Sequence, residues 1–337
     1  MVCINMEYKA FVVSEDDSGS YLGGIKTLNI QDLPAGDVLI KVECSSLNFK
    51  DALSFSGNKG VTRKFPHTPG IDAAGEVVSC ATDDFKAGQK VLVVGYDLGM
   101  NTSGGFGEYI SVPAKWVMPM PVAMSAHQSM AWGTAGFTAA LCIDKLLMAG
   151  AKKEQGPVLV SGASGGVGSI AIMLLVKLGF EVHALTSKTA DKEYFKQLGV
   201  SEIVSRAEFL KSSAKPMLKP IYGSAIDVAG GDVLATMLKM IKPGGSVACC
   251  GLVASIELQT TVLPFILRGI NLLGVDSVEL PLNVKQDMWL KMASDWSLPA
   301  LLDQCQLIAK QQLADTLQSM LNGNIKGRYV LDHNLAG

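Results

Sequence analysis

Three small residues in the middle of the chain have a spacing suited to binding a pyrophosphate. Ala163, Gly165 and Gly168 match the pattern G-x-G-x-x-G, with alanine in the first place. Glycines at these places let the backbone turn tightly and approach the phosphates, which then rest on the amides and positive dipole of a helix start. The same pattern occurs in plain glycine-rich turns, so its meaning depends on the elements around it.

The segments on either side of this turn supply the strand and the helix that such a site needs. Residues 158–160 are a short apolar run, typical of a buried parallel strand. Residues 167–178 then follow a helical period, which Gly179 ends. Because both flanking elements are present, the sequence predicts a dinucleotide-binding turn rather than a plain loop.

The end of the next expected strand indicates which dinucleotide binds. An NAD site usually has Asp or Glu about 20 residues past the glycines, where the carboxylate binds the ribose hydroxyls. In this chain the segment 186–189 reads Thr-Ser-Lys-Thr. A carboxylate would repel a 2′-phosphate, whereas hydroxyls and the Lys188 ammonium group can bind it, and Arg206 can supply a second cation. We therefore expect NADPH as the cofactor rather than NADH.

Composition narrows the class of protein. The 337 residues are 48% hydrophobic and 18% charged, which provides enough apolar material for two packed domains. A net charge of −2 gives no basic surface for nucleic acid. The seven cysteines include no C-x-x-C pair and are expected to be reduced thiols. Early acidic residues argue against a signal peptide, and the apolar runs are too short for a bilayer, so we expect a cytoplasmic protein with no membrane contact.

The order of the expected elements indicates an α/β chain in two parts. Up to about residue 126 the pattern is mostly β structure broken by Gly and Pro, typical of a barrel-like domain with long loops. The sequence then becomes helical from residue 125, and strands alternate with helices, which predicts a doubly wound parallel sheet. A helix before Gly323 and a strand at 328–331 are expected to return to the first part.

The expected strands of the first part include 38–43, 74–78 and 90–94. Those of the second part are 158–160, 181–185, 202–205, 224–229, 246–250 and 270–276, with further helices at 192–198 and 232–241.

Four further motifs are Ser-Leu-Asn-Phe-Lys-Asp-Ala at 46–52, Phe-Pro-His-Thr-Pro-Gly-Ile-Asp-Ala-Ala-Gly-Glu-Val at 65–77, Gly-Thr-Ala-Gly-Phe-Thr-Ala at 133–139 and Ser-Gly-Ala-Ser-Gly-Gly-Val-Gly at 161–168. Together they resemble the medium-chain dehydrogenase/reductase superfamily. More narrowly, the segments 261–270, 274–277 and 325–328 resemble the quinone-oxidoreductase-like acrylyl-CoA reductases of the YhdH/AcuI group. The likeness extends from about residue 8 to residue 331.

This resemblance implies a fold and an assembly. It implies a GroES-like, β-rich catalytic domain formed by residues 1–126 and 278–337, and a Rossmann NADP-binding domain formed by residues 127–277. It also implies an active site in the cleft between these domains, and a homodimer.

The resemblance further implies which residues contact NADP. Phe49 would lie beside the nicotinamide, where the family tends to have Tyr, so any role of that hydroxyl is lost in this chain. The residues expected at the pyrophosphate are Ser164, Gly165, Gly166 and Val167. Those expected at the adenosine phosphate are Ser187, Lys188, Thr189 and Arg206, and those expected around the rest of the cofactor are Leu252, Ile266, Ser277 and Arg328.

The positions at which related alcohol dehydrogenases bind zinc do not offer zinc ligands here. The catalytic zinc of those enzymes uses Cys, a Gly-His-Glu segment and a later Cys or His, and the corresponding places are Asn48 and Gly70-Ile-Asp72. Their structural zinc needs four close cysteines, and residues 90–115 contain none. Because zinc sites in proteins need several nitrogen and sulfur ligands, we expect no metal.

Chemistry without a metal favours reduction over alcohol oxidation. Oxidation of an alcohol would need a group that lowers the alcohol pKa, whereas a C=C bond conjugated to a carbonyl accepts hydride more easily. The protein then has to align the reactants, exclude water and offer donors to the carbonyl oxygen. Asn48 is the candidate for positioning substrate or nicotinamide, and Asp51 is expected to hold its loop.

The leading hypothesis from these residues and the resemblance is NADPH-dependent reduction of acrylyl-CoA to propanoyl-CoA. One alternative keeps the cofactor but uses quinones or small enones as acceptors. Another, of a different class, is a protein that binds NADPH without turning anything over.

Overall fold

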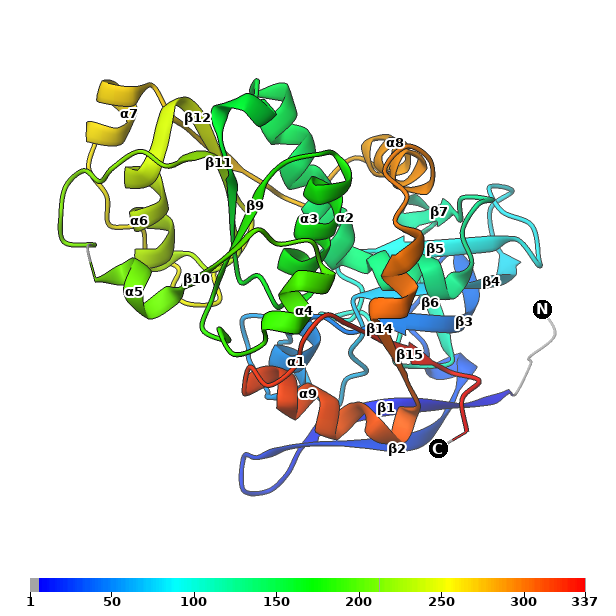
Figure 1. The fold of residues 1–337 in the computed structure, drawn as a ribbon. Helices are drawn as coiled ribbons and strands as arrows, with labels where there is room; N and C mark the ends of the chain where they lie inside the picture. The colour runs from blue at the N-terminus through cyan, green and yellow to red at the C-terminus, as the bar shows by residue number, and fades with distance from the viewer. Residues whose placement is uncertain (1–5, 212, 337) are drawn as a thin grey trace. The chain divides into compact units, whose positions relative to one another are not determined.

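The computed structural model describes residues 6–211 and 213–336, and the chain forms two units (Figure 1). The first unit combines both ends of the chain, Met1–Thr134 and Val278–Gly337. The second unit, Ala135–Ser277, is inserted between these two segments.

The second unit is built on a six-stranded parallel sheet with the strand order β10-β9-β8-β11-β12-β13. Its strands are β8 (Val158–Ser161), β9 (Val182–Thr186), β10 (Glu202–Ser205), β11 (Tyr222–Asp227), β12 (Ile241–Cys249) and β13 (Asn271–Gly274). Its helices are α3 (Gly166–Lys177), α4 (Lys192–Gln197), α5 (Arg206–Leu210), α6 (Gly231–Met240), α7 (Leu263–Arg268) and the short 3-10 turn η3 (Lys153–Gln155).

The strand order follows from how the chain builds this sheet. It begins at β8 in the middle, adds β9 and β10 on one side, and then crosses to β11, β12 and β13 on the other. Because strand-helix-strand crossovers are right-handed, this reversal places helices on both faces. Figure 1 shows α3 and α4 over one face and α5 and α6 over the other. The predicted doubly wound parallel sheet is therefore confirmed.

The first unit contains a mainly antiparallel sheet with the order β14-β15-β3-β4-β5-β7, to which β6 is added by pairing with β3. Its strands are β3 (Val38–Ser46), β4 (Asp72–Cys80), β5 (Lys90–Val94), β6 (Tyr109–Val112), β7 (Val117–Pro119), β14 (Cys305–Ile308) and β15 (Arg328–Asp332). A separate hairpin pairs β1 (Glu7–Glu15) with β2 (Tyr21–Asn29). The helices are α1 (Phe49–Phe55), α8 (Leu282–Ala293) and α9 (Leu313–Leu321), with 3-10 turns η1 (Ile30–Asp32), η2 (Ala114–Trp116), η4 (Pro299–Gln304) and η5 (Lys310–Gln312).

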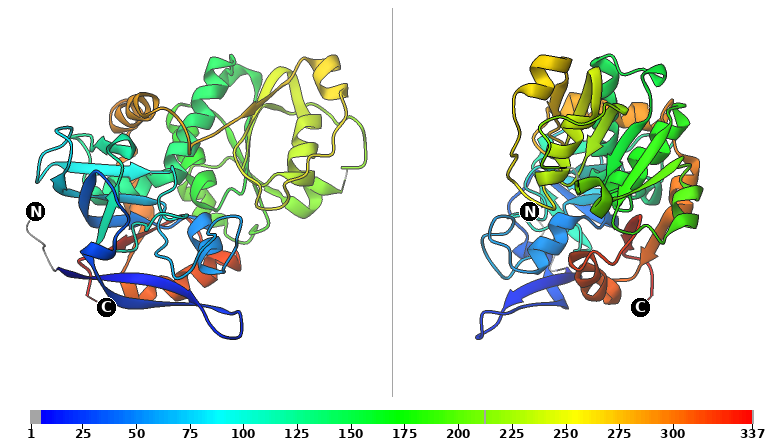
Figure 2. Two further views of the ribbon diagram at one scale, coloured as in Figure 1. Left: turned by 180° about the vertical axis from the view of Figure 1, so that it is seen from behind. Right: turned by 60° about the vertical axis from the view of Figure 1, so that its left-hand side comes forward.

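Strand β3 is the centre of this unit. Val38, Ile40 and Val42 are buried and alternate with more exposed residues, so one face of β3 packs into the core while the strand pairs with β4, β6 and β15. The pairing with β15 joins segments from the two ends of the chain, which Figure 2 shows from two further sides. The tail thus returns to the first unit.

Helix α2 (Ala126–Met148) carries the chain from the first unit into the second. Its backbone is kinked at Gly133, where φ is 50° and ψ is −160°. The first unit ends at Thr134, directly after this kink. In the described part of the chain no helix combines the length and the apolar character that crossing a bilayer requires.

Two elements differ from the sequence-based expectation for identifiable reasons. Strand β12 begins at Ile241, five residues before the expected start, because it continues through Pro243, Gly244 and Gly245 with an interruption in its pairing to β11. Helix α8 has a mixed, polar sequence in which the pattern predicts no element, although Met288, Trp289 and Met292 are buried.

Candidate functional site

The glycine-rich turn lies at the carboxyl edge of the parallel sheet, between β8 and α3. Gly162 adopts φ 55°, and its carbonyl accepts a 2.9 Å hydrogen bond from the Gly165 amide, which closes the turn. A Cβ atom at Gly168 would collide with the same carbonyl oxygen, so glycine is required for α3 to begin this close to the strand. Ser164, Gly165, Gly166 and Val167 form the end of the turn and the start of α3. This arrangement fits a dinucleotide pyrophosphate.

A buried carboxylate ties together the two strands at which the sheet reverses its order. Asp227, at the end of β11, accepts a 2.7 Å hydrogen bond from the Ser161 hydroxyl at the end of β8. Its other oxygen accepts one of 2.7 Å from the Gly230 amide. Burial raises the pKa of Asp227. This pair is absent from the sequence-based prediction, although an Asp at the end of an apolar strand is a signal that indicates such a residue.

The residues expected at the adenosine phosphate follow two neighbouring strands. Ser205 of β10 pairs directly with Thr186 of β9, and adjacent strands lie about 4.8 Å apart, so the segment 187–189 and Arg206 start from neighbouring points of the sheet edge. The Thr186 hydroxyl accepts a 3.0 Å hydrogen bond from the Lys188 amide, which turns the chain. The arrangement brings hydroxyls and two cations to one edge, and the segment 187–189 has no carboxylate.

The remaining positions of the second unit are less clearly grouped. Leu252 follows β12 and Ile266 lies in α7, and both side chains are largely exposed. Ser277 is buried and accepts a 2.8 Å hydrogen bond from the Thr138 hydroxyl. The cofactor contacts implied for these three residues stay predictions.

In the first unit a buried network surrounds Asn48. The Asn48 side-chain amide donates a 2.8 Å hydrogen bond to Oδ2 of Asp72 and a 3.1 Å one to the Ser46 hydroxyl. The same Oδ2 accepts from the Ser46 hydroxyl and, at 2.8 Å, from the Thr134 amide. Oδ1 of Asp72 accepts from the Thr134 hydroxyl at 2.6 Å. Asp72 is fully buried, so its four donors replace the water that would otherwise solvate the carboxylate.

Asp51 holds the loop that carries Asn48, as expected. Its Oδ2 accepts a 2.7 Å hydrogen bond from the Asn48 amide, and its Oδ1 accepts from the amides of Gly70 and Ile71 at 3.1 and 2.9 Å. Burial, and then the charge of Asp72, raise the pKa of Asp51 to about 7, while the three amide donors act in the opposite direction. Asp51 therefore fixes the start of α1, where Phe49 is the first residue.

Arg328 is buried against backbone rather than exposed to a ligand surface. Its Nε donates a 3.0 Å hydrogen bond to the Ala131 carbonyl, and its Nη1 a 3.1 Å one to the Leu47 carbonyl. Burial lowers the pKa of this guanidinium. Arg328 thus joins β15 to the start of α2 and to the loop before α1, and a direct contact to the cofactor stays a prediction.

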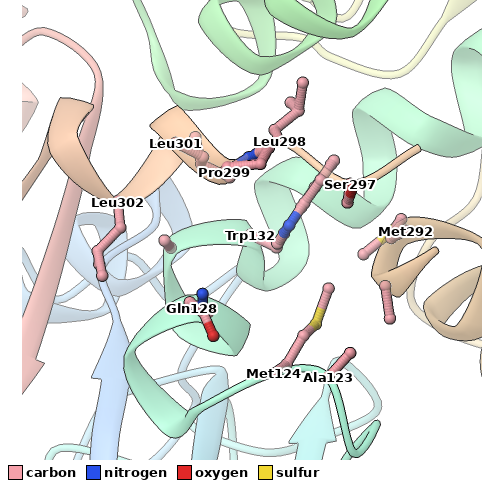
Figure 3. A pocket seen from close by; sticks show the side chains of 12 residues that line it. Ala123, Met124, Gln128, Trp132, Met292, Ser297, Leu298, Pro299, Leu301 and Leu302 are labelled. Atoms are coloured by element: carbon pink, nitrogen blue, oxygen red, sulfur yellow. The ribbon is translucent and has the colours of Figure 1, made fainter. Parts of the chain in front are cut away.

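A pocket of about 260 Å³ lies in the first unit, lined by the first turns of α2, the end of α8 and the η4 segment. Figure 3 shows Trp132, Gln128 and Met124 from α2 and the segment before it, with Met292 and Leu298 opposite. None of the predicted site residues lines it. We therefore assign no part of the predicted site to this pocket.

Two family models match the chain. The alcohol dehydrogenase GroES-like domain matches residues 34–122, and the zinc-binding dehydrogenase family matches residues 166–294. The first range lies within the first unit. The second range covers most of the second unit and continues into the segment from residue 278 onward that belongs to the first unit.

Named relatives are similar along nearly the whole chain. Acrylyl-CoA reductase AcuI of Ruegeria pomeroyi is 39% identical over 328 residues, which cover 97% of this chain and 99% of AcuI. The crystal structure of Escherichia coli K-12 YhdH with bound NADPH has a TM-score of 0.92 at 40% identity and covers 96% of this chain and 100% of that one. The crystal structure of Bacillus subtilis YhfP with NAD bound has a TM-score of 0.93 at 40% identity and covers 97% and 99%.

Proposed function

Because the chain belongs to the quinone-oxidoreductase-like YhdH/AcuI group of the medium-chain dehydrogenase/reductase superfamily, we propose that it reduces acrylyl-CoA to propanoyl-CoA with NADPH. The support for this substrate is the similarity to AcuI over almost the full length of both chains. The support for this cofactor is the composition of the β9 and β10 ends, together with the NADPH bound to YhdH.

The observation that carries the reaction assignment is the donor set around Asn48. One matching family is described as zinc-binding, so the question is whether the residues at the corresponding zinc positions can coordinate zinc. The Asn48 amide donates its hydrogens to Asp72 and Ser46, and the Asp72 carboxylate already accepts from four groups. These groups do not fit a tetrahedral zinc centre, and no step of the proposed reaction uses zinc.

The residues of the second unit would hold the cofactor. The turn 164–167 and the first amides of α3 would bind the pyrophosphate, and Ser187, Lys188, Thr189 and Arg206 would bind the 2′-phosphate. Bound NADPH would supply the hydride that adds to the β carbon of the enoyl thioester.

We assign the residues of the first unit a role in positioning the reactants, and none of them transfers a proton. Asn48 acts as a positioning residue, because its side-chain amide fixes the loop before α1 through hydrogen bonds to Ser46 and Asp72. Phe49, the first residue of α1, would present a ring with no acidic hydrogen beside the nicotinamide. Since Phe49 has no hydroxyl to give, we propose that the proton for the α carbon comes from solvent water.

The cofactor assignment is tested by titrating the purified chain with NADPH and with NADH. We expect tighter binding of NADPH. Ser187→Asp should weaken NADPH binding by about 10- to 100-fold, because a carboxylate near the 2′-phosphate costs roughly 1.4–3 kcal/mol, while NADH binding stays within a few-fold of its original value. Ser201→Asp is the matched control. Ser201 precedes the amino end of β10, whereas Ser187 follows the carboxyl end of the neighbouring strand β9. Equal binding of both dinucleotides to the unmodified chain would remove NADPH from the proposal.

The substrate assignment is tested by steady-state assays with NADPH. We expect a larger kcat/KM for acrylyl-CoA than for a benzoquinone or a small enone. The reverse order would identify a quinone or enone reductase. NADPH binding without turnover of any of these acceptors would favour the non-catalytic alternative.

A further inference from the structure

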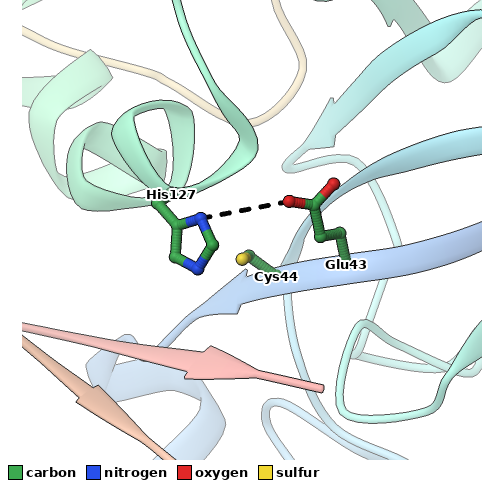
Figure 4. A group of neighbouring side chains, drawn as sticks. All are labelled: Glu43, Cys44 and His127. Carbon is green, nitrogen blue, oxygen red and sulfur yellow. Dashed lines mark ion pairs between the residues drawn. The ribbon is translucent and has the colours of Figure 1, made fainter. Parts of the chain in front are cut away.

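A cluster of metal-type ligands lies in the first unit and involves none of the residues proposed above for the reaction (Figure 4). Glu43 and Cys44 belong to β3, and His127 belongs to the first turn of α2. One carboxylate oxygen, the thiol sulfur and one ring nitrogen all lie within 4.8 Å of one another. Within residues 6–211 and 213–336, this is the one group of three His, Cys, Asp or Glu side chains with such an arrangement.

An irregularity in β3 brings the first two ligands together. Successive residues of a regular strand point to opposite faces of the sheet, so Glu43 and Cys44 would normally diverge. The pairing of β3 with β4 shifts register between Val42 and Cys44, where Val42 faces Gly75 and Cys44 faces Ala74. Such a bulge re-aims side chains, and it lets both Glu43 and Cys44 approach His127.

The third ligand is oriented by a second carboxylate. Nε2 of His127 lies 2.8 Å from Oδ2 of Asp332, the β15 residue that pairs with Cys44. When Nε2 donates its hydrogen to Asp332, Nδ1 is the nitrogen that can bind a metal, and it lies 3.9 Å from Oε1 of Glu43. A histidine held by a carboxylate through one nitrogen, with the other nitrogen available, is the usual second-shell arrangement of metal sites.

The Glu43 carboxylate can leave its ion pair with Lys90 to act as a ligand, and a metal ion can reach the cluster from solvent. The Lys90 ammonium group lies 3.2 Å from Oε2 of Glu43, but it lies closer, at 2.7 Å, to Glu76. Lys90 therefore keeps a partner when Glu43 turns inward. The side chains of Glu43 and His127 are 29% and 27% exposed, whereas Cys44 is fully buried, so an ion would enter from their side and meet the sulfur last.

We propose that Glu43, Cys44 and His127 bind a zinc-type divalent cation, with a water molecule as the fourth ligand. Zn²⁺ accepts sulfur, imidazole nitrogen and carboxylate oxygen together, at about 2.0–2.3 Å in a tetrahedron whose ligand atoms are ~3.5 Å apart. The side chains need to move inward by only about 1 Å to reach this geometry. The thiol proton passes to solvent as the metal–sulfur bond forms. The bound ion would join β3 to α2, and this site departs from the sequence-based expectation of no metal.

The experiment is a cobalt and zinc titration of the full chain after treatment with a chelator. Co²⁺ is used because a thiolate ligand produces a charge-transfer band in the near ultraviolet. We expect one Co²⁺ per chain with this band, and its loss when Zn²⁺ is added. Cys44→Ser and His127→Gln should each abolish the band, and Asp332→Asn should weaken the affinity about 10- to 100-fold. Cys80→Ser in β4 is the matched control, and the band should persist.

Several results would overturn the proposal. They are the absence of a thiolate band in the unmodified chain, its persistence in Cys44→Ser, or its loss in Cys80→Ser. If Cys44→Ser does not fold, the His127→Gln variant decides, because the His127 side chain is only partly buried. Zn²⁺ should raise the thermal unfolding midpoint of the unmodified chain and not that of His127→Gln. Neither NADPH nor an enoyl thioester is present in these measurements, so their outcome is independent of the proposed reductase activity.

Discussion

His333 is a single buried side chain whose surroundings favour its neutral form. Its Nε2 hydrogen is donated to the Gly105 carbonyl at 2.9 Å, and its Nδ1 is buried with no hydrogen-bond partner among the described residues. Burial, with a smaller contribution from Lys310, lowers its pKa from 6.5 to about 4, although Glu108 and Asp332 act in the opposite direction. Between about pH 4 and 6.5, His333 is therefore neutral in the native chain and protonated in the unfolded chain.

This difference predicts how acid affects stability. Between about pH 6.5 and 4 the unfolded state binds a proton on His333 that the native state does not, so the free energy of unfolding falls as the pH is lowered through this window. The full effect is on the order of 3 kcal/mol. His333→Gln keeps a donor for the Gly105 carbonyl and should flatten this dependence. The measurement is urea unfolding at several pH values, followed by tryptophan fluorescence, because Trp116, Trp132, Trp289 and Trp296 all belong to the first unit. A variant with an unchanged pH dependence would contradict the assignment.

At the residue scale, the sequence indicates a candidate site only where residues close together in the sequence form it. The turn 161–168 and the segment 186–189 were identified because each lies within one strand-turn unit. The network of Asn48, Asp72 and Thr134 depends on how β3, β4 and α2 pack, and nothing in the local sequence of any one of them indicates the others. The same holds for Glu43, Cys44 and His127, since alternation along β3 predicts that Glu43 and Cys44 face apart.

At the scale of elements, the kink of α2 shows why one position has to be glycine. A Cβ at Gly133 would collide with the Ser46 hydroxyl and would lie 2.8 Å from Oδ2 of Asp72 and 2.9 Å from Nη2 of Arg328. Its φ of 50° is also unfavourable for any residue with a side chain. The glycine therefore lets α2 bend and press its backbone against the Asp72 network.

We expect Gly133→Ala to destabilise the first unit by about 2–4 kcal/mol, from backbone strain together with displacement of the network. Gly323→Ala is the control, because Gly323 has φ of 69° but open space around the added methyl group. It should cost only ~1 kcal/mol. Urea unfolding followed by tryptophan fluorescence compares the two variants, and equal losses would show that the collision at Gly133 has no cost.

Elements with a clear pattern were predicted best. The bounds of β5 and β10 agree with the expected 90–94 and 202–205, because each is a short run of strand-forming residues between polar or glycine-containing segments. The start of β12 was wrong, because Pro and Gly within it indicate a break, whereas the strand extends across them to Ile241, which pairs with Tyr222 of β11. Helix α8 was missed because tertiary packing of Trp289 and Met292, rather than an apolar stripe, stabilises it.

At the scale of the whole molecule, the first unit depends on a segment at the far end of the chain. Strand β15 pairs with the central strand β3 between Val330 and Ser46 and between Asp332 and Cys44. Leu331, also in β15, is fully buried in a cluster with Phe11 and Leu47. The homodimer implied by the resemblance stays a prediction, and light scattering of the purified chain measures it.

A chain ending at Gln304 would lack β14, α9, β15 and Arg328. The Cys44–Ser46 end of β3 would lose its partner on one side, while β6 would still pair with Val38–Lys41. We expect the first unit of this truncated chain to lose its cooperative unfolding transition, measured by tryptophan fluorescence during heating, and the chain to aggregate. Removal of only the residues after Asn334, which follow β15, is the control and should preserve the transition. A cooperative transition in the shorter chain would contradict the role assigned to β15.

The insertion of one unit inside the other also sets an order for biosynthesis. The ribosome completes residues 135–277 before it makes β14 and β15, so the inserted unit has all of its strands while the first unit still lacks two. We expect the nucleotide-binding unit to fold first on the nascent chain, since domains fold as units during translation. During this interval the Cys44–Ser46 end of β3 still lacks its partner β15, so this is the stage at which a chaperone would be most needed.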